Sequence, residues 1–117
     1  MDKETIVELL EDTMNVFVSE KLHEGICAIL SKKITAWESN NGIASRDFRF
    51  MSNIVTDYIP EFTPETFGVT EVIFCGKKRK LKNLNVDSRR STYWWPLNEE
   101  GLQHRINALK YLIEKYR

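Results

Sequence analysis

Two adjacent tryptophans form the most distinctive chemical feature of the sequence. Residues 93–96 read Tyr-Trp-Trp-Pro, and they include two of the three tryptophans of the chain. Aromatic side chains and arginine are the groups that most often anchor protein interfaces, and aromatic rings also stack on nucleic-acid bases. The segment therefore predicts a binding surface.

Arginines close to this segment complete the predicted site. Arg89 and Arg90 precede the aromatic residues, and Arg105 lies one helical turn after Gly101, where the missing side chain leaves room for a ligand or for neighbouring backbone. Guanidinium groups bind phosphate and carboxylate through paired N–H donors. The predicted binding residues are Arg89, Arg90, Tyr93, Trp94, Trp95 and Arg105.

The two tryptophans allow a second, purely structural interpretation. Adjacent side chains of a strand point to opposite faces, so we expect Trp94 and Trp95 on opposite sides of a strand. One of them is then exposed, unless the sheet is covered on both faces and both are core residues. Losing a buried tryptophan typically costs ~3–5 kcal/mol, so a melting temperature separates the two interpretations.

The residues that commonly perform catalysis form no recognisable set. His23 and His104 are the two histidines, and neither has the spacing of a metal site with another ligand. His23 lies one helical turn before Cys27, which allows a thiol with its base, but free cysteine is more often a packed residue. The same holds for Cys75 in an apolar segment, and the glycines form no phosphate loop. We therefore expect no catalytic residue, metal or cofactor.

Charge is balanced over the chain but separated along it. The 117 residues carry 17 basic and 17 acidic side chains. Seven acids and two bases fall within residues 2–24, whereas seven bases and one acid fall within residues 77–90. The run at residues 77–80 is typical of a solvated hairpin tip, and the basic segment 77–90 also allows nucleic-acid binding. The acidic segment of one copy could pair with the basic segment of another, which allows a homo-oligomer.

The compartment is predicted from what the sequence lacks. No apolar stretch approaches the roughly 20 residues that cross a bilayer, and the first residues do not resemble a secretory signal. The two cysteines are consistent with reduced thiols in a reducing compartment. We expect a cytoplasmic protein without a membrane partner.

Apolar residues at helical spacing predict three helices in the first part of the chain. Residues 4–18 and 22–37 place apolar side chains three and four positions apart, although Gly25 interrupts the second run. Ser45 is a favoured N-cap for a third helix, which ends before Pro60.

The pattern then changes to that of short strands. A helical turn at residues 64–68 precedes a run of β-branched and aromatic residues at 69–75. Residues 81–86 and 91–95 are candidates for a second and a third strand. Alternatively, residues 77–90 form a mobile loop.

The terminal helix has the clearest signals. Asn98 is a favoured N-cap, and Leu97 and Leu102 have the spacing of a hydrophobic staple. The sequence therefore predicts an α+β fold with three N-terminal helices, a small antiparallel sheet of two or three strands and a long C-terminal helix. All 117 residues form one domain, helical over 1–67 and with the strands and last helix over 68–117.

Three short motifs resemble those of small uncharacterised phage and prophage accessory proteins. They are a glycine-hydrophobic-cysteine helix at residues 25–30, the Tyr-Trp-Trp-Pro element at 93–97, and a closing helix at 101–113 with Arg105 before its apolar stripe. The basic segment 77–90 departs from that pattern. The resemblance implies a protein that binds a host factor, and it draws attention to Cys27, Tyr93, Trp94, Trp95, Pro96 and Arg105.

We therefore expect a small phage-type binding protein, and not an enzyme, that inhibits a host defence factor by direct protein binding in the host cytoplasm. Two alternatives remain open. In one, the protein sequesters a nucleotide-type immune signal through aromatic stacking and arginine contacts to phosphate. In the other, residues 77–90 bind nucleic acid and Trp94 stacks on an unpaired base.

Overall fold

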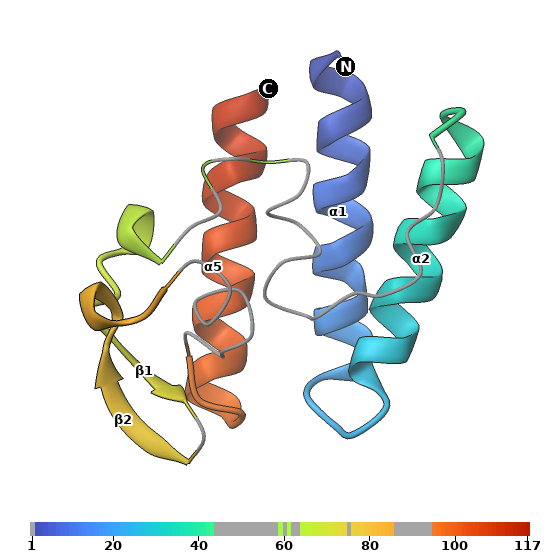
Figure 1. The fold of residues 1–117 in the computed structure, drawn as a ribbon. Helices are drawn as coiled ribbons and strands as arrows, with labels where there is room; N and C mark the ends of the chain where they lie inside the picture. The colour runs from blue at the N-terminus through green and yellow to red at the C-terminus, as the bar shows by residue number, and fades with distance from the viewer. Residues whose placement is uncertain (1, 44–58, 60, 62–63, 75, 86–94) are drawn as a thin grey trace.

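Helices and a hairpin occupy separate parts of the molecule. The computed structural model describes residues 2–43, 59, 61, 64–74, 76–85 and 95–117. Its α-helices are α1 (Lys3–Glu20), α2 (Ile26–Asn40) and α5 (Glu99–Tyr116), and its strands are β1 (Glu71–Phe74) and β2 (Lys77–Lys80). Two short 3-10 helices, η1 (Glu65–Phe67) and η2 (Leu81–Asn83), flank the hairpin (Figure 1). The predicted α+β class is confirmed.

The number of N-terminal helices differs from the prediction. The described part of the N-terminal half contains two α-helices and not three, and the third long helix is the C-terminal one. The helix predicted to begin at Ser45 lies outside the described residues. The second helix begins at Ile26 because Gly25 is its N-cap, and the Gly25 N–H donates to His23 Nδ1 at 3.0 Å in the preceding turn. The prediction that the helix includes residues 22–25 is therefore wrong.

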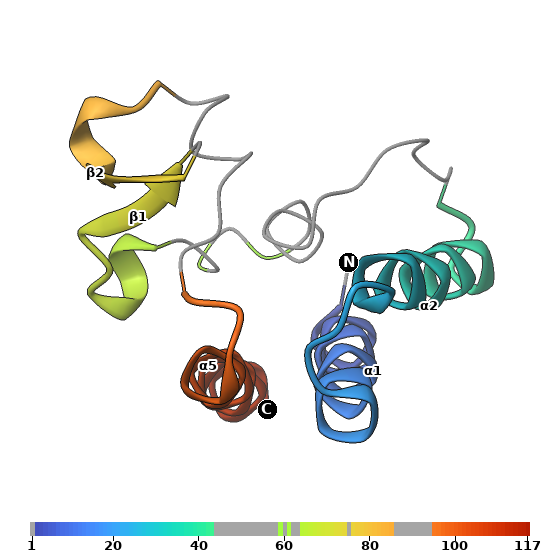
Figure 2. The same cartoon turned by 90° about the horizontal axis from the view of Figure 1, so that it is seen from below.

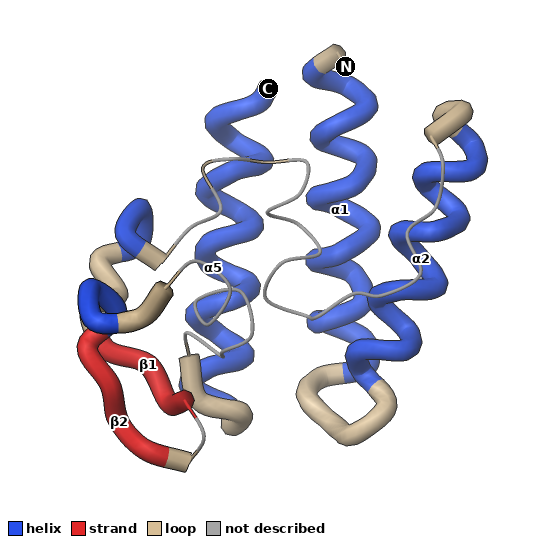
Figure 3. The backbone as a smooth tube through the Cα atoms, viewed as in Figure 1, coloured by secondary structure: helices blue, strands red, loops and turns tan. Residues whose placement is uncertain are grey.

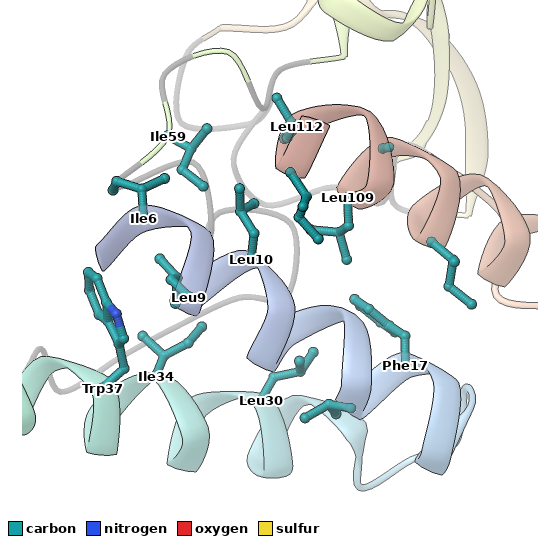
Figure 4. Packing of buried hydrophobic residues seen from close by; sticks show 14 of the residues in the cluster. Ile6, Leu9, Leu10, Phe17, Leu30, Ile34, Trp37, Ile59, Leu109 and Leu112 are labelled. Atoms are coloured by element: carbon teal, nitrogen blue, oxygen red, sulfur yellow. The ribbon is translucent and has the colours of Figure 1, made fainter. Parts of the chain in front are cut away.

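The main core lies between the three helices. Helix α1 runs between α2 and α5, and its apolar face contributes to both contacts (Figures 1 and 2). Trp37 is 2% exposed, and its Nε1–H donates to the Thr5 carbonyl at 3.0 Å. This tryptophan, which lies outside the Tyr-Trp-Trp-Pro segment, is therefore a core residue with its polar group satisfied. Figure 4 shows part of this cluster, which consists of Ile6, Leu9, Leu10, Val16, Phe17, Ile26, Leu30, Ile34, Trp37, Ile59, Ile106, Ala108, Leu109, Leu112 and Ile113.

Capping explains where α1 begins. The Asp2 carboxylate accepts from the Thr5 N–H at 2.9 Å and from the Thr5 hydroxyl at 2.6 Å. These bonds, the hydroxyl first, hold the pKa of Asp2 below its usual range. A carboxylate at this position satisfies a free N–H group and interacts favourably with the positive end of the helix dipole.

The basic run itself forms the second strand. Strands β1 and β2 pair antiparallel from Glu71 opposite Lys80 to Phe74 opposite Lys77. Gly76 has a φ of 75°, which lets the chain turn at once and begin pairing at Lys77. The prediction of a strand at residues 81–86 is thus wrong, since Leu81–Asn83 form η2. Of the predicted third strand, residues 91–94 lie outside the described part, and Trp95 is not in a strand.

Figure 3 separates the helical and strand regions by colour. Val72 in β1 and Leu81 in η2 are buried, each 3% exposed, and neither residue belongs to the helical core cluster. Within the described ranges, no helix has both the length and the apolar character needed to cross a membrane.

Candidate functional site

The start of α5 is built as the sequence predicts. The Asn98 side chain accepts from the Gly101 N–H at 2.9 Å, and Glu99 and Glu100 occupy the first turn. Leu97, which the sequence predicts to pack against Leu102, is instead 56% exposed. The cap therefore fixes the first turn of the helix and leaves an apolar side chain at the surface beside it.

Trp95 lies just before this cap and is half-buried between two rings. Its ring centroid is 5.9 Å from that of His104, with planes 20° apart, and 5.9 Å from that of Phe67, with planes 59° apart. Trp95 also packs against the edge of the helical core. It is therefore a boundary residue that joins the core to the surface.

Arg105 holds the segment before the cap onto α5. Its Nη1 donates to the Pro96 carbonyl and its Nη2 to the Trp95 carbonyl, both at 3.0 Å. The guanidinium carbon is 5.9 Å from the centroid of the Trp95 ring, and Arg105 is 6% exposed. The predicted contact residue is thus a positioning residue, because its guanidinium group binds backbone carbonyls of the same chain.

Gly101 makes this close approach possible. A Cβ atom at position 101 would lie 1.7 Å from the Pro96 carbonyl oxygen and 2.9 Å from Arg105 Nη1. Neighbouring backbone therefore occupies the space that the missing side chain leaves, as one version of the prediction has it. Glycine here allows the Pro96 carbonyl to reach both the helix surface and the guanidinium group.

Four rings form what we call the aromatic face: Phe67, Trp95, His104 and Tyr111. Tyr111 is 54% exposed, and its ring lies edge-on to Phe67 with centroids 6.1 Å apart. The His104 side chain is 47% exposed, and its Nε2 lies 3.6 Å from Glu100 Oε1. The face surrounds an open pocket of about 480 Å³, which is also lined by Thr66, Asn107 and Ala108.

Sequence reasoning found Trp95 and missed the other three residues of this face. His104 and Tyr111 are seven positions apart, which places them on one side of α5, and that spacing was readable. Phe67 comes from η1, far along the chain, and only the tertiary fold brings it to Trp95. The other predicted site residues, Arg89, Arg90, Tyr93 and Trp94, lie outside the described part.

Cys27 and His23, the possible thiol and base, each contact other groups. His23 Nδ1 accepts from the Gly25 N–H, and His23 Nε2 lies 3.9 Å from Glu20 Oε1. Cys27 is half-buried against the helical core. Among the described residues, no three histidine, cysteine, aspartate or glutamate side chains are grouped as metal ligands would be.

Comparisons of the chain with models of protein families, with curated proteins and with solved structures find no significant match.

Proposed function

We propose that this protein is a binding protein that inhibits its target by direct contact through the aromatic face. The observation that carries the proposal is the grouping of Phe67, Trp95, His104 and Tyr111 around one open pocket, with Tyr111 54% exposed. Tyrosine and tryptophan offer a large apolar area with a polar group at one end, and they are enriched where binding energy concentrates.

Two contacts hold this surface in place before any partner binds. Arg105 fixes the backbone on which Trp95 stands, and Gly101 admits that backbone against the helix. A surface that is ordered in advance loses less conformational freedom on binding. This preorganisation supports a protein that inhibits by covering a surface of its target, which requires no catalytic group.

The target that we propose is a host defence protein. The motifs at residues 25–30, 93–97 and 101–113 resemble those of phage accessory proteins, and this resemblance supports a host defence protein as the target. Inhibition then follows when the aromatic face covers a surface that the target needs for its own activity.

A nucleotide-type signal is the second candidate ligand. The pocket of about 480 Å³ falls within the usual size range for small-molecule sites, and the nearly parallel Trp95 and His104 rings already show the stacking that a base would extend. Because Arg105 binds backbone carbonyls, phosphate contacts would fall to other cations, such as Arg89 and Arg90.

Tyr111→Ala tests the proposal with little risk to the fold. Tyr111 is exposed on α5, and alanine is the best helix former. Wild-type and variant proteins are immobilised and exposed to host lysate, and the eluates are analysed for proteins and for nucleotides. We expect a host protein that the wild type retains and that the variant loses at least tenfold, which corresponds to about 1.4 kcal/mol.

Lys110→Ala is the matched control, since Lys110 is the exposed neighbour of Tyr111 on the same helix. It should retain the partner. His104→Ala, at the other end of the face, should weaken retention like Tyr111→Ala. Equal retention by all variants would contradict the proposal, and a nucleotide recovered in place of a protein would favour the second candidate.

A further inference from the structure

The outer edge of β2 is a second exposed surface. In Figures 1 and 2, β1 lies between β2 and the three α-helices, so β2 is the outer of the two described strands. The sheet formed by the described residues has the order β1-β2, and no other strand among them pairs with this edge. All four side chains of β2 are exposed.

The register identifies the backbone groups on that edge. The Leu81 N–H donates to the Thr70 carbonyl at 2.8 Å, and hydrogen-bonded pairs alternate along an antiparallel ladder. Arg79 opposite Val72 is therefore a hydrogen-bonded pair, whereas Lys78 and Lys80 are not. The N–H and C=O groups of Lys78 and Lys80 point outward, away from β1.

Basic side chains flank this edge on both faces of the strand. Lys78 and Lys80 share a face with Ile73, which is 51% exposed, and Lys77 and Arg79 lie on the opposite face. Residues 71–82 contain five bases and one acid, Glu71, whose carboxylate is 3.7 Å from Lys78 Nζ. An added strand would therefore meet cations on both of its own faces.

We propose that the outer edge of β2 binds an extended acidic segment of a partner protein, which adds to the hairpin as a third strand. Main-chain hydrogen bonds to Lys78 and Lys80 provide affinity, and pairing of carboxylates with the four basic side chains provides selectivity. This inference goes beyond the proposed function and does not depend on the aromatic face.

The same charges decide which strands are rejected. Lysine on an edge strand opposes association of two copies, because like charges directly opposite each other repel. Two β2 strands placed edge to edge would bring eight cations together. An acidic strand would be attracted by the same cations. The edge therefore favours an acidic segment over a second copy of this chain.

Amide measurements test the proposal directly. The probe is a short peptide of alternating glutamate and valine, added to ¹⁵N-labelled protein. We expect the Lys78 and Lys80 amide signals to shift and their hydrogen exchange to slow by roughly tenfold or more. The Lys77 and Arg79 amides, which already bond to β1, should change less.

Two further probes separate strand addition from charge attraction. A peptide of equal charge, in which proline replaces the valines, loses every second N–H donor and favours the polyproline II conformation over a paired strand, so it should bind much more weakly. A thymidine oligonucleotide engages side chains alone, so it should not protect the Lys78 and Lys80 amides. Equal binding of both peptides, or binding of the oligonucleotide alone, would overturn the proposal.

Substitutions provide an independent check on the protein itself. Lys78→Pro removes an outward N–H without removing a ladder bond, and edge strands tolerate proline. Lys78→Gln removes the same charge and keeps the N–H group. We expect a greater loss of peptide binding for Lys78→Pro than for Lys78→Gln, with the Val72 signals retained as evidence of an intact hairpin.

Equal losses for the two variants, or concentration-dependent association of the protein through β2, would overturn the proposal. Tyr111→Ala should bind the peptide as the wild type does. The failure of this inference is therefore distinguishable from the failure of the aromatic face as a partner surface.

Discussion

The helical region and the hairpin region use their residues in opposite ways. Helices α1, α2 and α5 bury a continuous apolar cluster in which Leu9, Leu10 and Leu112 are fully covered. The hairpin and η2 bury Val72 and Leu81 apart from that cluster, and all four side chains of β2 are exposed. Since apolar burial is the main favourable contribution to folding, the helices supply most of the stability of the described residues.

The aromatic face lies between α5 and η1, the 3-10 helix that precedes the hairpin. Trp95 packs against the core with one part of its ring and forms the surface with the rest, while Arg105 and Gly101 keep its backbone against α5. We therefore expect different effects in the two places. Substitutions in the helical core should unfold the protein, whereas substitutions around Trp95 should displace the aromatic face.

The largest effect is expected in the helical core. Leu9→Ala removes a side chain with 0% exposure between α1 and α2, and it should lower the free energy of unfolding by ~2–5 kcal/mol. Chemical denaturation measures this loss. Val18→Ala on the same helix, at a position 55% exposed, is the control and should stay within about 0.5 kcal/mol of wild type. Similar losses for both would break the comparison.

Arg105→Met should have the next largest effect. Methionine keeps the apolar stem but leaves the Trp95 and Pro96 carbonyls without two charged donors, and such hydrogen bonds contribute ~1.5–3 kcal/mol. We expect a loss of about 2 kcal/mol together with a changed near-ultraviolet circular dichroism signal from tryptophan. Lys110→Met on an exposed position of the same helix should change neither quantity.

Gly101→Ala should affect the boundary more than the core. Alanine is the better helix former by ~1 kcal/mol, but its Cβ would overlap the Pro96 carbonyl oxygen at 1.7 Å. Displacing that backbone typically costs ~1–3 kcal/mol, so we expect a small net loss of stability with a clear change in tryptophan fluorescence. Increased stability with unchanged fluorescence would show that the segment 95–97 does not rely on this contact.

The smallest effect is expected at the bond between Tyr116 and Glu61. The Tyr116 hydroxyl donates to Glu61 Oε2 at 2.6 Å, and Tyr116→Phe should cost about 1 kcal/mol or less at neutral pH because solvent screens the pair. Burial, and then the bond to Glu61, raise the pKa of Tyr116 to about 12, and the bond from Tyr116 lowers the pKa of Glu61.

The pH dependence of this bond follows from those two shifts. Its contribution is fully present below the usual tyrosine pKa of 10.0 and is lost as pH rises through about 12. At the acid end, the contribution is present above the usual glutamate pKa of 4.5 and is lost as pH falls through the lowered value. Wild type and Tyr116→Phe should therefore converge in stability at the acid end, and the wild type should lose its advantage as pH rises through about 12, as measured by thermal melting.

Local sequence signals were sufficient for α1 and for the start of α5. The apolar spacing in residues 4–18 predicted α1, and Asn98 predicted the start of α5, because helix periodicity and capping depend on residues a few positions apart. The sequence misplaces the second strand because the apolar spacing of residues 81–86 resembles that of a strand. Gly76 allows a tight turn, and the ladder then begins with charged residues whose side chains need no burial.

By itself, the sequence determined the α+β class, the apolar stripe of α1 and the cap of α5. These features depend on local periodicity and on residue type. Only the tertiary structure decided that Arg105 binds the Trp95 and Pro96 carbonyls, that Phe67 joins the aromatic face, and that β2 is the outer of the two described strands. Such contacts depend on where distant segments meet, and that is settled by how the apolar faces of the helices pack around α1.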